Sequence, residues 1–212
     1  VILSPEDQTI TKGGPRERRV FFDRLFSIIN KEYLSTLQMY NRALKQRNAL
    51  LNNKESLGEE IYLPWEEKLS IHAVKLWELR KKIFTDYTNS LNSVVGEYQE
   101  NLILTVFYNE KNYKKNDYEK LLRKTRDKDF ILGRTTTGPH RDNIDFLWEY
   151  KNLRDYGSQG EHKISLILLK LAEINLVKEK TGEYPIILLD DVFAKLDLKR
   201  SKKLVSYLNS IR

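Results

Sequence analysis

Two long amphipathic stretches dominate the first half of the chain and limit the folds open to it. Residues 16–51 carry one apolar stripe, and a second stripe begins near Pro64. The first stripe has a helical, near-heptad spacing: Phe22, Phe26, Ile29, Tyr33, Leu37, Tyr40 and Leu44. The second continues the pattern: Trp65, Leu69, His72, Leu76, Leu79, Ile83, Tyr87, Leu91 and Val94. Each helix needs the other to cover its stripe, so the sequence predicts an antiparallel helical hairpin.

The composition is that of a soluble globular protein. Of 212 residues, 40% are hydrophobic and 32% are charged, and no apolar run is long enough to span a membrane. The absence of cysteine excludes disulfides and cysteine-ligated metals and fits a cytosolic protein. The chain starts without Met and without a signal-peptide pattern, which predicts that it begins inside a longer protein.

The charge balance is compatible with nucleic-acid binding. The net charge is +7, and residues 16–47 hold eight basic residues against three acidic ones. Lys and Arg neutralise phosphates, so the first helix is a candidate DNA surface. The alternative, a helix face that is simply solvated, is the more common explanation. The DNA-binding candidates on this helix are Arg16, Arg18, Arg19 and Arg24.

The hydrophobic period changes near residue 100, which predicts a second region of mixed strands and helices. We expect strands over residues 102–108, 129–134 and 144–150, a polar helix over 112–128 and a hairpin or loop near 149–155. A helix after Ser158 is apolar on most sides, so it should be buried, and Gly182 should end it. A last amphipathic helix is expected over 198–211.

The pair Asp190 and Asp191 follows the unbroken apolar run Ile186–Leu189. Such a run suits a short strand buried on both faces of a parallel sheet. Ligands bind at the carboxyl ends of such strands, where an Asp can hold the Mg²⁺ of a nucleotide. Helix capping by the two aspartates is an equally good explanation of the pair taken alone.

Two further stretches are rich in turn-forming residues. Thr135–Asp142 ends with a cation and a carboxylate, and Tyr156–His162 runs straight into the buried helix. The Ser158 hydroxyl and the free N–H groups at a helix start can bind an anion. A plain N-cap explains Ser158 as well.

Taken in order, these stretches resemble the RecF family of bacterial DNA replication and repair proteins, which are ATP-binding-cassette ATPases related to structural-maintenance-of-chromosomes proteins. The resemblance covers nearly the whole chain. It rests on Thr137-Gly-Pro-His-Arg-Asp142, Ser158-Gln-Gly-Glu161, Ile187-Leu-Leu-Asp-Asp-Val192 and Leu196-Asp197. The early stretches Leu3-Ser-Pro-Glu-Asp7, Lys12-Gly13, Pro15–Asp23 and Tyr40-Asn-Arg-Ala-Leu-Lys-Gln-Arg-Asn48 resemble the family as well.

The resemblance implies an α/β fold: the second lobe of an ABC-type ATPase, part of a P-loop NTPase sheet, with an inserted helical hairpin arm. Residues 1–15 would end the first lobe, 16–98 would form the arm and 99–212 the second lobe. No Gly-x-x-x-x-Gly-Lys-Ser/Thr is present in these 212 residues. We therefore expect the chain alone to bind ATP poorly and not to hydrolyse it.

The resemblance also implies residue roles. Asp190 would hold Mg²⁺, and Asp191 would act as the general base for water attacking ATP. Ser158, Gln159, Gly160 and Glu161 would form the signature loop, which binds the γ-phosphate of ATP held by a second subunit. Asp197 would lie in the D-loop along that dimer seam. His140 and Arg141 mark the family, and either a structural role or a phosphate contact is open to them.

The function implied is that of an ATP-dependent DNA clamp in replication, gap repair and recombination, including recombinase loading and the SOS response. ATP and Mg²⁺ would be its cofactors. Its partners would be gapped or junction DNA, a second copy of itself and recombination-mediator proteins, in the cytoplasm near the nucleoid. The alternative is a non-catalytic coiled-coil DNA-binding or scaffold protein that has lost the use of ATP.

Overall fold

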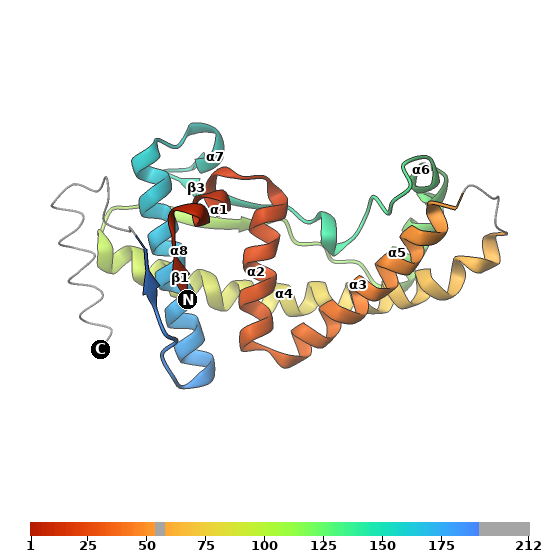
Figure 1. Cartoon of the computed structure of the whole chain (residues 1–212), viewed down its shortest axis with the longest axis horizontal. Helices are drawn as coiled ribbons and strands as arrows, with labels where there is room; N and C mark the ends of the chain where they lie inside the picture. Colours follow the sequence, from red (N-terminus) through yellow and green to blue (C-terminus); the bar gives the residue numbers. More distant parts are fainter. Residues whose placement is uncertain (54–57, 191–212) are drawn as a thin grey trace. The chain divides into compact units, whose positions relative to one another are not determined.

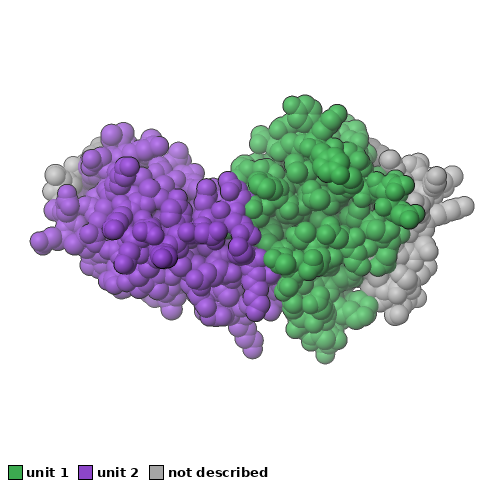
Figure 2. Space-filling view, turned by 180° about the vertical axis from the view of Figure 1, so that it is seen from behind, with its two compact units in different colours: residues 1–25, 84–108, 143–212 green, residues 26–83, 109–142 purple. Residues whose placement is uncertain are grey.

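The computed structural model describes residues 1–53 and 58–190. The chain forms two compact units, which are coloured separately in Figure 2. Unit 1 comprises Val1–Leu25, Phe84–Tyr108 and Asn143–Arg212, and unit 2 comprises Phe26–Ile83 and Asn109–Asp142. Unit 2 thus groups residues 109–142 with the helices between residues 26 and 83.

Two long helices contribute to both units (Figure 1): α2 (Pro15–Ile29) and α4 (Leu63–Tyr98). Unit 2 further holds α3 (Lys31–Leu51), η2 (Glu59–Ile61), α5 (Lys115–Lys124), α6 (Arg126–Ile131) and η3 (Pro139–Arg141). Unit 1 further holds β1 (Ile2–Leu3), η1 (Pro5–Asp7), α1 (Gln8–Lys12), β2 (Leu104–Tyr108), β3 (Ile144–Trp148), β4 (Lys151–Asn152), α7 (Leu153–Tyr156), α8 (Gln159–Thr181) and β5 (Leu188–Leu189). The helix expected over 198–211 lies outside the described residues.

The first amphipathic stretch is two helices, so the prediction of one continuous helix over residues 16–51 was wrong. The chain leaves helical geometry at Asn30, whose φ and ψ are −143° and 106°. The Asn30 side chain accepts a hydrogen bond from the backbone N–H of Tyr33 at 2.8 Å. Asn is a preferred N-cap because this bond satisfies a free donor at the helix start. The apolar stripe continues across the break, which is why its spacing did not reveal it.

Within unit 2, α3 and the first part of α4 run antiparallel, as predicted. Glu32 near the start of α3 pairs with Lys75, while Arg47 near its end pairs with Glu66 at the start of α4. The stripes lie on the facing sides, and Tyr33, Tyr40, Leu69 and Leu76 are fully or almost fully buried. Mutual coverage of the two stripes therefore holds this helix pair together.

A buried charge network joins this helix pair to the segment after α5. The guanidinium of Arg47 is fully buried and donates to Asp129 at 2.7 Å, Glu66 at 3.2 Å and Thr135 at 2.8 Å. Arg126 supplies a second cation to Glu66, at 2.7 Å. Two carboxylates and two guanidinium groups thus balance one another where water is excluded.

Residues 129–134 do not form the strand expected from their apolar run, and that prediction was wrong. Helix α6 extends to Ile131, and the side chains of Phe130, Ile131 and Leu132 are exposed. The buried residue of this segment is Asp129, which is drawn inward by Arg47. A long-range ion pair therefore overrides the local β-propensity.

Unit 1 contains an antiparallel sheet in the order β2-β3-β4. The strands expected at 102–108 and 144–150 pair with Leu104 opposite Trp148 and Tyr108 opposite Ile144. The turn between β3 and β4 is formed by Glu149 and Tyr150, both with positive φ, as in the tight turns that match sheet twist. Of the hairpin or loop expected near 149–155, the structure shows the hairpin.

Helix α8 runs through unit 1 with buried side chains on almost all sides, as its composition predicted. Its backbone accepts hydrogen bonds from α4: Tyr87 Oη donates to Leu169 O and Ser90 Oγ to Ala172 O, at 2.9 and 3.0 Å. Gly182 ends it with φ +82°, a left-handed conformation that Gly adopts without strain. Across the described residues, no helix has the length and apolarity required to cross a bilayer.

The strand before Asp190 is short. β5 pairs in parallel with β1, with Ile2 opposite Leu188 and Leu3 opposite Leu189. The parallel pairing of β5 agrees with the prediction. The prediction that this strand is buried on both faces was wrong. Ile186 is 81% and Leu188 is 56% exposed. Among the described strands β1 is the single neighbour of β5.

The network around Arg47 yields a stability prediction. Replacing Arg47 by Met should lower the free energy of unfolding by about 3–5 kcal/mol, because Glu66 and Asp129 would stay buried with less compensation. Urea unfolding followed by circular dichroism measures this loss.

Arg123→Met is the matched control, because Arg123 makes an exposed pair with Glu119. Such surface pairs contribute about 0–1 kcal/mol. Equal losses in the two variants would contradict the assignment of a stabilising role to the buried network.

Candidate functional site

The loop Ser158–Glu161 starts helix α8 with a reciprocal pair of hydrogen bonds. Ser158 is the N-cap, and its hydroxyl accepts from the backbone N–H of Glu161 at 3.3 Å. The Glu161 carboxylate accepts from the backbone N–H of Ser158 at 2.7 Å. This capping box holds the loop in one conformation. Ser158 and Gln159 are exposed, so the positive end of the helix dipole faces solvent.

A buried histidine packs behind this loop. His162 is 4% exposed, and its Nδ1 has no hydrogen-bond partner within the described part of the chain. Burial lowers the pKa of His162, and the nearby charge of Lys12 lowers it further, so the ring is neutral at pH 7. A Cβ on Gly157 would approach the His162 ring to 3.1 Å and the Leu153 carbonyl to 2.4 Å. The tight turn before Ser158 therefore needs glycine.

A pocket of about 190 Å³ opens beside the loop. Trp148, Lys151, Tyr156 and Glu161 are among its lining residues. It combines aromatic surface with one cation, Lys151, and two carboxylates, Glu149 and Glu161. Tyr156 is 74% exposed, so the aromatic edge of this pocket is accessible from solvent.

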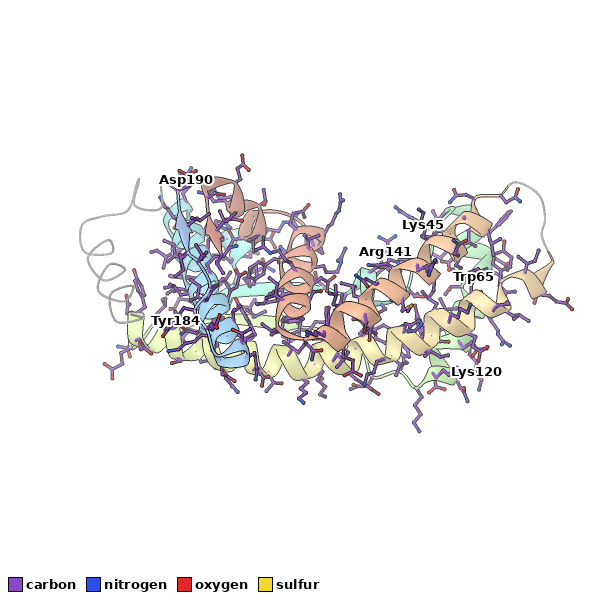
Figure 3. All side chains as sticks on the ribbon, turned by 60° about the horizontal axis from the view of Figure 1, so that its bottom comes forward. Lys45, Trp65, Lys120, Arg141, Tyr184 and Asp190 are labelled. Atoms are coloured by element: carbon purple, nitrogen blue, oxygen red, sulfur yellow. The ribbon has the colours of Figure 1, made fainter. Side chains whose placement is uncertain are left out.

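Asp190 lies directly after β5, where the sequence placed it, and its side chain is exposed. Figure 3 labels it together with Tyr184, which precedes the same strand. Asp191, the candidate general base, and Asp197, the candidate D-loop residue, lie outside the described residues. Asp190 is therefore the one member of this acidic group whose surroundings can be described.

These groups fit the cofactors that the sequence implies. Mg²⁺ prefers carboxylate oxygens, and the Asp190 carboxylate is open to solvent at a strand end. Phosphate groups prefer helix N-termini, and the start of α8 offers the Ser158 hydroxyl and backbone donors that lack intrahelical acceptors. The Glu161 carboxylate already lies at this helix start. A bound phosphate and the Glu161 carboxylate would therefore both interact with the positive end of the helix dipole.

The stretch Thr135–Asp142 is bonded to the arm helices of unit 2. His140 Nε2 lies 3.0 Å from Thr135 O, and Nδ1 lies 2.5 Å from Tyr40 Oη. A carbonyl can only accept, so Nε2 carries the proton and Nδ1 accepts from the tyrosine. Burial raises the pKa of Tyr40, which keeps its hydroxyl as the donor. Both ring nitrogens of His140 are thus engaged in structural hydrogen bonds.

The neighbours of His140 are also anchored. The buried carboxylate of Asp142 accepts from Arg80 at 2.7 Å and from the Trp77 indole at 3.0 Å. Gly138 has φ +129°, and a Cβ there would lie 2.4 Å from Tyr118 Oη and 2.5 Å from Tyr40 Oη. Arg141, in contrast, is exposed. In this stretch Arg141 is therefore the family-marker residue that can reach a ligand.

The four arginines proposed for DNA binding have different surroundings. Arg18 is 2% exposed and donates to the carbonyls of Gly13 and Ile144 and to Asp145, so its burial argues against a phosphate contact. Arg24 pairs with Glu173 at 3.5 Å, and Arg19 is half-buried. Arg16 is exposed. Arg16 and Arg24 line a pocket of about 320 Å³ together with two carboxylates, Asp7 and Glu17.

Comparison with known proteins places this geometry in a family. The chain is 37% identical over 219 residues to the DNA replication and repair protein RecF of Lachnoclostridium phytofermentans, covering 100% of the chain and 59% of the relative. It is 38% identical to RecF of Azobacteroides pseudotrichonymphae, covering 98% of the chain and 57% of the relative. The chain belongs to the RecF family. It spans less than two thirds of the length of these relatives.

Solved structures give the same assignment. The chain matches a structure of the recombination mediator protein RecF-ATPrS in the RecFOR pathway with a TM-score of 0.87 and 33% identity, over 98% of this chain and 59% of that one. A structure of RecF-ATP in the same pathway matches equally well. The fold is therefore that of a RecF-type ABC ATPase lobe with a helical arm. No protein-family model matches the chain.

Sequence reasoning missed several residues that shape these sites. Arg47, Arg80 and Lys170 are buried cations, although charged residues are rarely buried. The one available signal was position, because each lies four residues from a buried apolar side chain of its helix: Leu51 for Arg47, Leu76 for Arg80 and Leu166 for Lys170. His162 was also missed, since a lone His after a capping box gives no sequence signal.

The hydrogen bond between Tyr40 and His140 can be tested by removing one oxygen. Tyr40→Phe should lower the free energy of unfolding by about 1–3 kcal/mol, because it leaves the buried Nδ1 acceptor without a donor. Chemical denaturation measures the change. Tyr156→Phe is the control: that hydroxyl is exposed, and the expected change is within about 0.5 kcal/mol. A Tyr40→Phe variant as stable as the control would leave His140 free for another role.

Proposed function

We propose that this chain is the arm and second ATPase lobe of an ATP-dependent DNA clamp acting in DNA replication, gap repair and recombination. The observation that carries the proposal is the match to RecF proteins over the whole chain, at 37% identity and with a TM-score of 0.87. The exposed, capped start of α8 is the part of the chain best suited to an ATP phosphate.

In this proposal Ser158, Gln159 and Gly160 bind the γ-phosphate of ATP held by a second copy of the protein. The capping box fixes the direction of the Ser158 hydroxyl and of the first N–H groups before the second copy arrives. Preorganised donors need no reordering on binding, which favours the complex. ATP would therefore join two copies of the protein.

Asp190 would hold Mg²⁺ through its exposed carboxylate, and the metal would neutralise negative charge on the phosphates. Asp191 would orient and deprotonate the attacking water, and Asp197 would lie along the dimer seam. Asp is shorter than the Glu usual in related ATPases, which fits slow turnover.

The DNA substrate would be gapped or junction DNA with single- and double-stranded parts. Recombination-mediator proteins would be the partners, with recombinase loading and the SOS response as the outcome, in the cytoplasm near the nucleoid. One of the matched structures is described as a recombination mediator in the RecFOR pathway, which supports these partners.

The dimer is tested with Ser158→Arg, in a protein that carries this chain together with a Walker A loop. The added side chain should fill the space of the γ-phosphate and abolish ATP-dependent dimerisation, while ATP binding by the monomer remains. Sedimentation velocity with a non-hydrolysed ATP analogue measures the first property, and calorimetry measures the second.

Glu161→Gln is the matched control. Gln also completes a capping box, and the change removes a negative charge beside the phosphate, so dimerisation should be retained or strengthened. A normal ATP-dependent dimer in Ser158→Arg would refute the contact between subunits. A parent protein that bound DNA without ATP binding or dimerisation would favour a scaffold instead.

A further inference from the structure

The net charge of the chain resides in one of its two units. Unit 1 contains 17 basic and 17 acidic residues, while unit 2 contains 20 basic and 13 acidic residues. The whole excess of +7 is therefore carried by unit 2. The arginines first proposed for DNA binding, Arg16 to Arg24, lie in the neutral unit.

Part of this excess lies along one side of α3. Lys31, Arg42 and Lys45 are exposed and are separated by 11 and 3 residues, which at about 3.6 residues per turn places them on one side of the helix. The opposite side of α3 holds the buried residues Tyr33 and Tyr40. Residues 33–53 contain no Asp or Glu.

The stretch from Gly133 to Arg141 lies alongside the same helix. Asn52 donates to Gly133 O, Asn48 accepts from Thr135, and Tyr40 bonds to His140. These bonds hold the exposed side chains of Arg134 and Arg141 next to α3. Figure 3 shows Lys45 and Arg141 along this helix, with Lys120 well away from both.

The five cations of this face make no ion pairs within residues 1–53 and 58–190. They are Lys31, Arg42, Lys45, Arg134 and Arg141. Lys75 and Lys115 of unit 2 pair with Glu32 and Glu67. Lys120, Lys124 and Lys128 are exposed and, among the described residues, make no ion pair either, so they serve as a matched comparison for the face. The face thus gathers positive charge that no described residue neutralises through an ion pair.

We infer that this face, formed by α3 and residues 133–141, binds the phosphate backbone of duplex DNA. The inference rests on the proposed DNA-binding function and identifies the surface of the chain that contacts the DNA. From Lys31 to Lys45 the helix rises about 21 Å, which matches about six base-pair steps of 3.4 Å. The aromatic side chains of α3 are buried, so the helix offers no base-stacking platform of the kind that single strands require. The binding is therefore electrostatic and independent of sequence.

The test compares two triple variants of this 212-residue chain. Arg42→Gln/Lys45→Gln/Arg141→Gln removes three cations from the face. Lys120→Gln/Lys124→Gln/Lys128→Gln removes three exposed cations from α5 and α6 and changes the net charge equally. Fluorescence anisotropy with labelled 20-base-pair duplex and 20-nucleotide single-stranded DNA, over a salt series, gives the slope of log affinity against log salt.

The face variant should reduce the duplex slope by about 2–3, since each lost phosphate contact removes about 0.9. Each single substitution in the face should reduce the duplex slope by about 0.9. The control variant should retain the slope of the parent chain. Equal slopes in the face and control variants would overturn the inference. A larger loss on single-stranded than on duplex DNA would overturn the duplex assignment. A parent chain that binds neither DNA would contradict the proposed DNA-binding function itself.

Discussion

The buried guanidinium of Arg47 is the interaction on which the rest of unit 2 depends. It joins α3 to Glu66 of α4, to Asp129 of α6 and to Thr135 in the following stretch. Because a buried cation requires these partners, the stretch after α6 cannot move from α3 without exposing an unpaired charge. Arg47 thereby holds Arg134 and Arg141 beside the exposed cations of α3, which are Lys31, Arg42 and Lys45. The same group that stabilises the arm also assembles its basic face.

The two units have different electrostatic characters that suit different ligands. Unit 1 is neutral and offers one capped helix start beside a small pocket, which fits a nucleotide phosphate. Unit 2 carries the entire charge excess and has an extended cationic face, which fits a repeating phosphate backbone. An ATPase that clamps DNA needs both kinds of surface.

Much of this arrangement could be predicted from the sequence, because apolar periodicity reports burial directly. The arm helices, strands β2 and β3 and the buried helix α8 followed from spacing, and Ser158 followed from capping chemistry. The break at Asn30 could not be read from the stripe, which continues through it. The helical state of residues 129–131 depends on Arg47, 82 residues away from Asp129, and no local pattern encodes such a contact. Charged helix residues were assumed to face solvent, so Arg18 was placed among the DNA candidates.

The face formed by α3 and residues 133–141 is the surface inferred to contact duplex DNA, and the surface of α5 and α6 in the same unit is not. Lysine acetylation footprinting of the chain with and without a duplex of about 20 base pairs tests this assignment most directly, because the DNA backbone shields the amines that it contacts. The account predicts that Lys31 and Lys45 lose reactivity when the duplex is bound, while Lys120, Lys124 and Lys128 keep theirs. Unchanged reactivity at Lys31 and Lys45 in a chain that has bound the duplex would contradict it.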